Sequence, residues 1–176
     1  MIVWNNSVLV KSLLNKMSTQ PRPDALSWDE CFTQMAFLIA QRSKDPATQA
    51  GAVIVDDQNV VIGLGYNGWP RGIAIADLPW ERDGDLVNTK YAYVVHAEEN
   101  AVYNTSLLPR GCRIYCTLYP CGECVKALIQ VGIKEVIYTN DKHHDEPIWV
   151  AGRKMLELAG VTVRQYEPQY RLKLEK

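Results

Sequence analysis

The segment RIYCTLYPCGECVKALIQVGIKEVIYT, residues 113–139, decides the fold. Its pattern predicts a strand over residues 113–118, a helix over residues 121–131 and a second strand over residues 134–139. Pro120 supports this division, because proline is favoured at the start of a helix. A strand, a helix and a strand in succession predict two parallel strands joined by a crossover helix.

Further strands and helices are predicted on both sides of this segment. Ser27 is a candidate N-cap, with Glu30 three residues later as its partner in a capping box. Residues 65–88 form the longest irregular stretch, and a loop of that length in a compact domain is usually functional. The alternation of strands and helices predicts an α/β fold with helices covering a sheet. The other predicted elements are a helix from Ser27 to near residues 43–45, a hairpin of strands at 52–55 and 60–64, helices at 96–104 and 146–159, and a last strand at 161–166.

The composition is that of an ordinary globular protein without a strongly charged surface. The chain has 176 residues, of which 47% are hydrophobic and 22% charged, and its formal net charge is -1. This length predicts one domain, and the near-neutral charge argues against binding a long nucleic acid. No apolar run approaches the ~20 residues needed to cross a membrane. Five cysteines are an odd number, which indicates thiols in a reducing compartment, the cytoplasm.

The first part of the chain differs from the rest. Residues 1–16 contain no acidic side chain, and we expect them to be a dispensable extension or, alternatively, a short helix over residues 8–16 docked on the body. Met17 is a candidate second start, and Pro21 and Pro23 mark a linker. The predicted division is an extension and linker over residues 1–26, a folded catalytic domain over residues 27–167 and a tail over residues 168–176.

Two short fragments supply the side chains of a metal site. His96-Ala97-Glu98 provides an imidazole and a carboxylate, and Pro120-Cys121-Gly122-Glu123-Cys124 provides two thiols. Taken alone, Cys-x-x-Cys is also typical of a redox pair or of half a structural zinc site. The three other cysteines form no second Cys-x-x-Cys. One imidazole and two thiols therefore predict a catalytic zinc, whose fourth position stays open for water.

Both fragments lie at predicted helix starts, where free N–H groups and partial positive charge lower the pKa of a cysteine. Cys121 and Cys124 can thus bind zinc as thiolates from one turn, with His96 completing the set. Glu98 is not needed as a ligand and is predicted to act as a proton shuttle at the zinc-bound water. The plainer interpretation of Glu98 is a carboxylate stabilised by the helix dipole. His-x-Glu combined with Pro-Cys-x-x-Cys is the known pattern of zinc nucleobase deaminases.

Several stretches beyond the zinc fragments match one known family. Arg42-Ser43-Lys44-Asp45-Pro46 and Gly65-Tyr66-Asn67-Gly68 are the most specific of them. On these residues, the chain from about Ser27 to Glu167 resembles the deoxycytidylate (dCMP) deaminases, within the cytidine deaminase-like superfamily. The further matching stretches are Gln49-Ala50-Gly51-Ala52, Leu78-Pro79-Trp80, Thr89-Lys90-Tyr91, Gly132-Ile133-Lys134-Glu135-Val136, Asp141-Lys142-His143-His144-Asp145 and Ala159-Gly160-Val161-Thr162.

The resemblance implies a three-layer α/β/α fold with a mixed five-stranded sheet. It also implies zinc-dependent hydrolysis of dCMP to dUMP and ammonia, which supplies dUMP for thymidylate synthesis. The residue roles that it implies are zinc binding by His96, Cys121 and Cys124, acid–base catalysis by Glu98, an Ala97 N–H facing the oxygen at the reacting carbon, a Tyr119 carbonyl accepting from the cytosine amino group, and an Asn67 side chain binding the deoxyribose hydroxyl.

A monophosphate substrate needs cations near its 5′ end. The candidates are Arg42, Ser43 and Lys44, with Lys142 behind them. Arginine suits bidentate contact with phosphate, and lysine suits point-charge contact. An ordinary solvated helix terminus would carry the same cations, because positive charge is favoured at a helix C-terminus.

Regulation is a further implication of the resemblance. Many family members are hexamers that dCTP activates and dTTP inhibits, with Mg²⁺ accompanying the triphosphate. Gly65, Tyr66, Asn67 and Gly68, with the loop after them, resemble the region that forms this allosteric site between subunits. A structural turn is the alternative interpretation, since glycine permits close backbone approach in either case.

Two positions depart from the family pattern. Glu99 stands where the family usually has an apolar residue, and its carboxylate is predicted to face a partner subunit or the regulatory pocket. Asp45 and Pro46 stand where some phage members have a cysteine pair for a second zinc, so we expect one zinc per chain.

Two other interpretations compete with a dCMP deaminase. A deaminase of free cytidine, guanine or transfer-RNA adenosine would use the same zinc pattern, but near-neutral charge argues against a large RNA partner. A zinc-stabilised binding module without turnover is the second. Glu98 argues against it, because a structural zinc site gains little from an unligated carboxylate.

Overall fold

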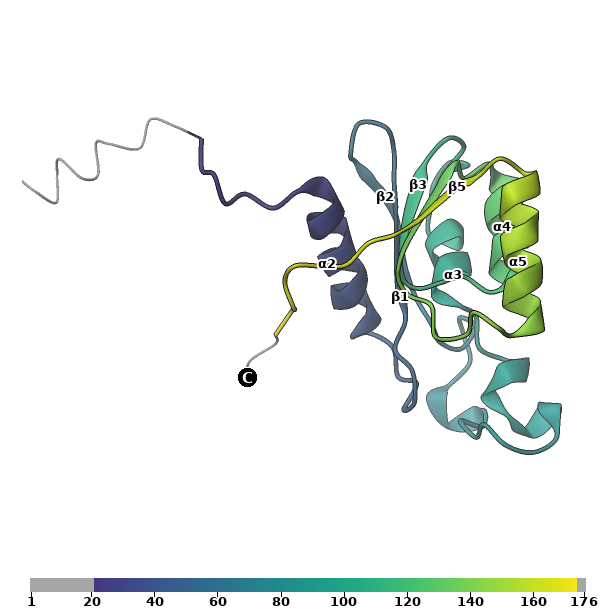
Figure 1. Cartoon of the computed structure of the whole chain (residues 1–176). Helices are drawn as coiled ribbons and strands as arrows, with labels where there is room; N and C mark the ends of the chain where they lie inside the picture. The colour runs from purple at the N-terminus through teal and green to yellow at the C-terminus, as the bar shows by residue number, and fades with distance from the viewer. Residues whose placement is uncertain (1–20, 174–176) are drawn as a thin grey trace, which may run out of the picture.

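Five strands and four α-helices make up the described part, residues 21–173, of this computed structural model (Figure 1). The expected extension over residues 1–16 lies outside the described residues. Within the described range, no helix combines the length and the apolar character needed to cross a membrane. The elements are α2 (Trp28–Ala40), β1 (Gly51–Val55), β2 (Val61–Tyr66), α3 (Ala97–Tyr103), β3 (Arg113–Leu118), α4 (Gly122–Val131), β4 (Glu135–Asn140), α5 (Pro147–Leu158) and β5 (Thr162–Gln165).

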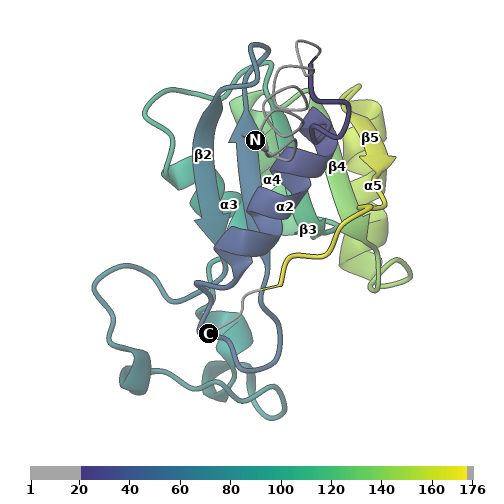
Figure 2. The ribbon, with the colours of Figure 1, turned by 90° about the vertical axis from the view of Figure 1, so that its left-hand side faces the viewer.

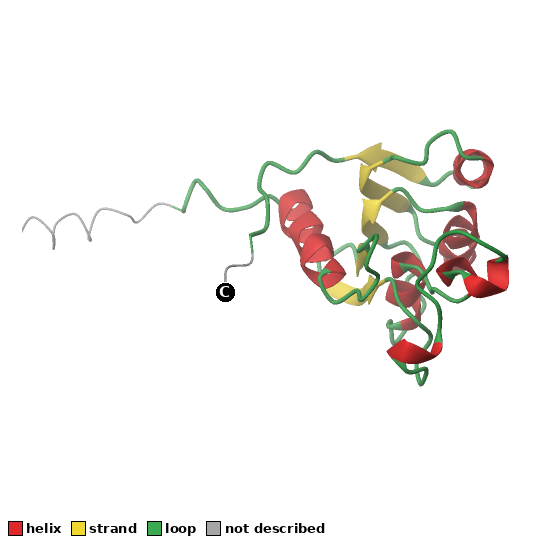
Figure 3. Ribbon diagram, turned by 90° about the horizontal axis from the view of Figure 1, so that it is seen from below, coloured by secondary structure: helices red, strands yellow, loops and turns green. Residues whose placement is uncertain are grey.

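The strands form one mixed sheet in the order β2-β1-β3-β4-β5. Strand β1 is antiparallel to both β2 and β3, whereas β3, β4 and β5 are parallel to one another. Helices α3, α4 and α5 cover one face and α2 covers the other, so the molecule has three layers (Figures 2 and 3). The predicted α/β/α fold with a mixed five-stranded sheet is confirmed, including the parallel crossovers.

Alternation along β1 divides the core between the two faces, because successive strand residues point to opposite sides. Ala52 and Ile54 join the larger cluster, which α3, α4 and α5 also line. Val53 and Val55 join the smaller cluster with Phe32 of α2. All four of these β1 side chains are fully buried, so both faces of β1 lie within the core.

The structure corrects several predicted boundaries. Helix α2 ends at Ala40, short of the expected residues 43–45, and the next two residues form a tight turn. Strand β2 continues to Tyr66, two residues into the stretch predicted as irregular. The irregular stretch itself contains two short 3-10 helices, at Ile75–Asp77 and Leu86–Asn88, and a third follows it at Lys90–Ala92.

Glycine at position 65 lets α3 lie directly against β2. A Cβ atom there would lie 2.1 Å from the carbonyl oxygen of Ala97 and 2.2 Å from the backbone nitrogen of Ala101. This contact explains why β2 tolerates a glycine where strand propensity alone disfavours one. The same contact sets how far the start of α3 stands from the sheet.

We therefore expect Gly65→Ala to destabilise the fold by about 1–3 kcal/mol or more, because the new methyl group overlaps backbone atoms that cannot rotate away. Chemical denaturation with zinc present measures the loss. Gly68→Ala is the matched control, since a Cβ at Gly68 would meet only the ring of Tyr66, at 3.8 Å. Equal stability of the two variants would contradict the packing argument.

A buried carboxylate in α2 holds the end of the chain. Glu30, only 3% exposed, accepts hydrogen bonds from the Tyr166 hydroxyl at 2.8 Å and from the backbone N–H groups of Gln169 at 2.9 Å and Tyr170 at 3.2 Å. Ser27 does cap the helix, since its hydroxyl accepts from the Glu30 N–H at 3.1 Å. The predicted capping box therefore has its Ser27 half, while the Glu30 side chain binds the C-terminal segment.

Candidate active site

The two predicted metal fragments lie at the starts of neighbouring helices. His96 is the N-cap of α3 and Cys121 is the N-cap of α4, and both have extended backbone conformations. Cys124 lies in the first turn of α4. Gly122 allows this arrangement, because a Cβ there would lie 2.6 Å from the carbonyl oxygen of Ile148 in α5. The start of α4 is thereby held closely against α5.

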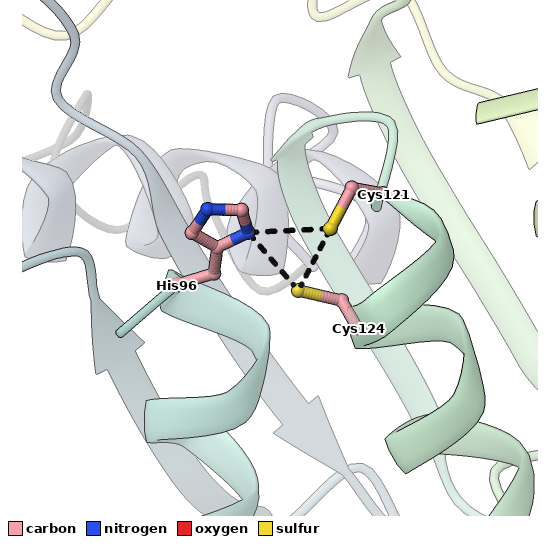
Figure 4. A group of neighbouring side chains, drawn as sticks. All are labelled: His96, Cys121 and Cys124. Carbon is pink, nitrogen blue, oxygen red and sulfur yellow. Dashed lines mark hydrogen bonds between the residues drawn. The ribbon is translucent and has the colours of Figure 1, made fainter. Parts of the chain in front are cut away.

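The three ligand atoms form a triangle of the size that zinc requires. Nδ1 of His96 lies 3.3 Å from Sγ of Cys124 and 3.4 Å from Sγ of Cys121, and the two sulfurs are 3.7 Å apart (Figure 4). A tetrahedral zinc, with bonds of about 2.3 Å to sulfur and 2.0–2.1 Å to nitrogen, separates two sulfurs by about 3.8 Å and a sulfur from a nitrogen by about 3.5 Å. The predicted zinc site at His96, Cys121 and Cys124 is confirmed.

Glu98 lies beside this triangle without belonging to it. Its Oε2 atom is 3.4 Å from Sγ of Cys124, and the residue is only 5% exposed. Burial raises the pKa of the Glu98 carboxyl, partly opposed by the charge of His96. A raised pKa makes the carboxylate easier to protonate, which suits a group that must both accept and deliver a proton.

Without zinc, hydrogen bonds among the three ligand side chains shift the pKa of each of them. A hydrogen bond from the Cys124 thiol lowers the pKa of Cys121 to about 4, despite partial burial. Contact with the Cys121 thiolate raises the pKa of His96 to about 9. The pKa of Cys124 is raised well above its ordinary value by the same thiolate and by burial. At pH 7, Cys121 is thus a thiolate, while His96 and Cys124 both hold protons.

Zinc binding is therefore expected to release about two protons at pH 7, because zinc requires a neutral imidazole and two thiolates. Since both raised pKa values lie above pH 7, affinity for zinc should fall as the pH is lowered, by roughly a hundredfold per unit around neutrality. Calorimetric titration of metal-free protein in buffers of different ionisation enthalpy measures the protons released. No proton release would contradict the assigned protonation states.

The zinc ligands open onto a cavity of about 440 Å³, which is large enough for a small ligand. Glu98, Ala97 and Tyr119 line it next to the metal ligands. Arg82 in the long loop before α3 and Lys142 in the connection from β4 to α5 also line it. The cavity lining thus includes both candidate catalytic groups and cations.

Comparison with known proteins agrees with this site. The family model described as the cytidine and deoxycytidylate deaminase zinc-binding region matches residues 26–140. The chain belongs to this deaminase family.

Relatives within the family narrow the resemblance to the dCMP branch. The deoxycytidylate deaminase of Mus musculus is 48% identical over 159 residues, which cover 89% of each chain. That of Homo sapiens is 48% identical over 158 residues, again 89% of each chain. A crystal structure of the dCMP deaminase from cyanophage S-TIM5, in complex with dCMP and dUMP, aligns with a TM-score of 0.64 and 26% identity over 84% of this chain and 100% of that one. The resemblance to dCMP deaminases stated from the sequence is confirmed.

Three residues that the family resemblance assigned to the base and sugar line the cavity, namely Asn67, Ala97 and Tyr119. The Asn67 amide also has structural contacts. Its Oδ1 accepts from the Ala50 N–H at 2.8 Å, and its Nδ2 donates to the Thr48 carbonyl at 2.9 Å. One lone pair of Oδ1 is left for a ligand, because an amide oxygen accepts two hydrogen bonds.

The cations assigned to the phosphate are divided between different places. Lys142 lines the zinc cavity, whereas Arg42, Ser43 and Lys44 are not among its lining residues. Arg42 is exposed in the turn after α2, and the Ser43 hydroxyl donates to the Asn67 carbonyl at 2.9 Å. Lys44 lines a separate groove.

Several cavity residues carried no individual signal in the sequence. Arg82 comes from the stretch over residues 65–88 that is predicted to be functional, and Lys90 and Tyr91 come from the residues just after it. His143 and Trp149 come from the segment around the start of α5. Lys90, Tyr91 and His143 lie in stretches that resemble the family, so those stretches offered the only pointer. Nothing in the spacing of Arg82 or Trp149 indicated that their side chains reach the same cavity.

A buried ion pair joins the long loop to the body of the domain. Nζ of Lys90 lies 2.5 Å from Oδ2 of Asp45, and their side chains are 7% and 2% exposed. The Asp45 carboxylate also accepts from the Ala47 N–H at 2.8 Å, the Thr48 N–H at 3.1 Å and Asn67 Nδ2 at 3.3 Å. One carboxylate thereby organises three segments that line the cavity.

The residues assigned to allosteric regulation lie on different surfaces. Gly65 packs against α3, and Asn67 lines the zinc cavity. Tyr66 and Gly68 line a separate groove of about 270 Å³. The groove also contains two cations and a stacked pair of indoles whose ring centres are 3.9 Å apart, namely Lys44, Arg71, Trp69 and Trp80.

The two departures from the family pattern have local contacts. Oε2 of Glu99 accepts from the backbone N–H of His96 at 3.4 Å, so this carboxylate lies at the N-terminus of α3. Asp45, in place of a metal-binding cysteine, is engaged by Lys90. Within residues 21–173, His96, Cys121 and Cys124 form the group able to hold a metal, and one zinc per chain stays a prediction for metal analysis.

Proposed function

We propose that this chain hydrolyses dCMP to dUMP and ammonia and so supplies dUMP for thymidylate synthesis. The observation that carries the proposal is the triangle of His96, Cys121 and Cys124, able to hold zinc, with the buried Glu98 beside it and a cavity that Glu98, Arg82 and Lys142 line. The mammalian relatives and the phage enzyme with bound dCMP and dUMP support the choice of substrate.

The chemistry divides between the metal and the protein. When bound, zinc supplies an acidified water at its open fourth position. The Glu98 carboxylate accepts a proton from the attacking water as the new C–O bond forms at the ring carbon. It delivers this proton to the adjacent ring nitrogen. It then takes a second proton from the new hydroxyl group on the ring carbon and passes it to the amino group, so that the C–N bond breaks, the hydroxyl oxygen becomes the carbonyl oxygen of dUMP and ammonia leaves. Burial of Glu98 supports this role, because its raised pKa eases protonation in mid-reaction.

Backbone groups are proposed to read the base. The Ala97 N–H faces the oxygen at the reacting carbon, and the Tyr119 carbonyl accepts from the amino group. The free lone pair of Asn67 Oδ1 accepts from the deoxyribose hydroxyl. These contacts would exclude the wrong ring, because a buried polar group left without its partner costs more than the contact gains.

An ammonia-release assay on a substrate panel tests the reaction. Zinc-loaded protein should act on dCMP in preference to deoxycytidine, CMP, cytosine, guanine and transfer-RNA adenosine. Preference for one of the other compounds would identify that compound, instead of dCMP, as the substrate. One bound zinc with no release from any of them would favour the binding module instead.

We further infer that Arg82 and Lys142 bind the 5′-phosphate. Both line the cavity, and each charge-assisted contact is worth about 1.5–3 kcal/mol. Arg82→Ala and Lys142→Ala should therefore raise KM for dCMP by roughly 10–100-fold while leaving kcat/KM for deoxycytidine nearly unchanged. Lys44→Ala is the matched control, since it removes a cation outside the cavity. A larger effect of Lys44→Ala would favour the phosphate residues predicted from the sequence, Arg42, Ser43 and Lys44.

Regulation is the finer part of the proposal. We infer that dCTP with Mg²⁺ activates and dTTP inhibits a hexamer, at the groove that contains Tyr66 and Gly68. Its stacked indoles suit a base, and Lys44 and Arg71 suit a triphosphate. Sigmoidal dCMP saturation that becomes hyperbolic with dCTP is the expected result. Hyperbolic kinetics unmoved by either triphosphate would remove regulation and leave the reaction intact.

The free thiols support a reducing, cytoplasmic setting.

A further inference from the structure

The carbonyl of Tyr119 is held by a side chain of α5. The indole Nε1–H of Trp149 donates to this oxygen at 3.2 Å. Trp149 is itself held on its ring face, because the His143 imidazole stacks on it with ring centres 4.6 Å apart and an angle of 26° between the planes. Tyr119, Trp149 and His143 all line the zinc cavity. An indole in the cavity wall therefore donates to a backbone oxygen in the same wall.

Every other group of Tyr119 is also fixed. Its N–H donates to the Asn140 carbonyl at 2.8 Å. The Arg153 guanidinium lies over its ring, 4.1 Å from the centre, and donates to both oxygens of Asp141 at 2.7 and 2.8 Å. The peptide plane that carries the Tyr119 oxygen therefore has little freedom to turn, and Trp149 is the contact at the oxygen itself.

We propose that Trp149 is a positioning residue that makes the site prefer a 4-aminopyrimidine to a 4-oxopyrimidine ring. A carbonyl oxygen has two lone pairs, and the indole N–H occupies one of them. The other lone pair is thereby aimed into the cavity, where it accepts from an amino group and repels an oxo oxygen at the same ring position. This inference rests on the proposed function, in which the Tyr119 carbonyl reads the amino group of cytosine.

The test compares substrate and product in Trp149→Phe, which keeps an aromatic ring beside His143 and removes the N–H donor. kcat/KM for dCMP should fall about tenfold, the effect of one lost hydrogen bond. The inhibition constant of dUMP should not rise, because the oxo ring makes no hydrogen bond to this oxygen and is repelled less when the lone pair is no longer aimed at it. Zinc content should stay the same. Trp28→Phe, at an exposed tryptophan of α2, is the matched control and should alter neither constant.

A parallel fall in dCMP turnover and dUMP binding, or no change in either, would overturn the proposal. If Trp149→Phe loses zinc, Trp149→His decides the question, because its ring N–H can restore the donor. If Trp149→His recovers the wild-type kcat/KM for dCMP relative to the inhibition constant of dUMP, the proposal is supported. If dCMP remains disfavoured relative to dUMP, the proposal is overturned. Direct binding of dCMP and dUMP in a Glu98→Gln background, with and without Trp149→Phe, gives the same ratio without turnover. Failure of the proposed reaction would therefore remain distinguishable from failure of this inference.

Discussion

Glu98→Gln should keep one zinc per chain and lose deaminase turnover by at least about 10²–10⁴-fold, the range that general acid–base catalysis supplies. Glutamine fills the same volume and leaves His96, Cys121 and Cys124 in place, but it cannot accept and return a proton. The loss should appear in kcat, since the substrate contacts proposed for Ala97 and Tyr119 are unaffected.

Ammonia release and metal analysis on the same preparation measure the two outcomes. Glu123→Gln is the matched control, because Glu123 lies between the two cysteine ligands in sequence but is exposed and paired with Lys126 at 2.6 Å. Its activity should stay within about twofold of the unmodified chain, as expected for an exposed ion pair. Full activity of Glu98→Gln would defeat the assignment of the proton shuttle.

Lys90→Met should destabilise the fold by about 3–5 kcal/mol, because it leaves the Asp45 carboxylate buried without its cation. The long loop would lose its main link to the body, so the cavity wall that carries Arg82 and Tyr91 should become mobile. Denaturant unfolding at saturating zinc measures the stability, and limited proteolysis between residues 69 and 94 measures the mobility.

Two comparisons make this result specific. Lys126→Met breaks an exposed pair whose side chains are 54% and 63% exposed, and it should cost less than about 1 kcal/mol. Replacing both buried partners, in Asp45→Asn with Lys90→Met, should recover part of the loss, because no charge is then left unpaired. A single Lys90→Met variant as stable as Lys126→Met would show that the pair is dispensable.

The parts of the fold that local pattern controls were predictable. The strand at residues 113–118 was placed without error, because its residues alternate between two buried faces. The zinc site was predictable because each fragment fits within one helix start, so that short spacing fixes the geometry. The prediction of Gly65 in a loop is wrong. Gly65 lies in β2, where the backbone of α3 leaves no room for a side chain, and α3 lies more than thirty positions later in the chain.

The cavity wall was harder to predict because its charges come from distant segments. Lys44 and Lys142 look alike in sequence, yet Lys142 lines the zinc cavity and Lys44 lines another groove. Lys90 and Asp45 are joined across 45 positions, and no periodicity records such a pairing. Sequence pattern therefore predicts functional side chains that lie within one helical turn of each other. It does not predict those that a loop brings together from distant parts of the chain.

The contact of Glu30 with the C-terminal segment has a consequence for synthesis on the ribosome. Helix α2 emerges well before the donors that satisfy its buried carboxylate, which belong to Tyr166, Gln169 and Tyr170. A nascent chain that stops before Tyr166 holds a desolvated anion with three donors missing, which disfavours stable docking of that helix. The domain should therefore complete its folding only after residues 166–170 have emerged, and a product terminated before them should be an early substrate for proteolytic quality control.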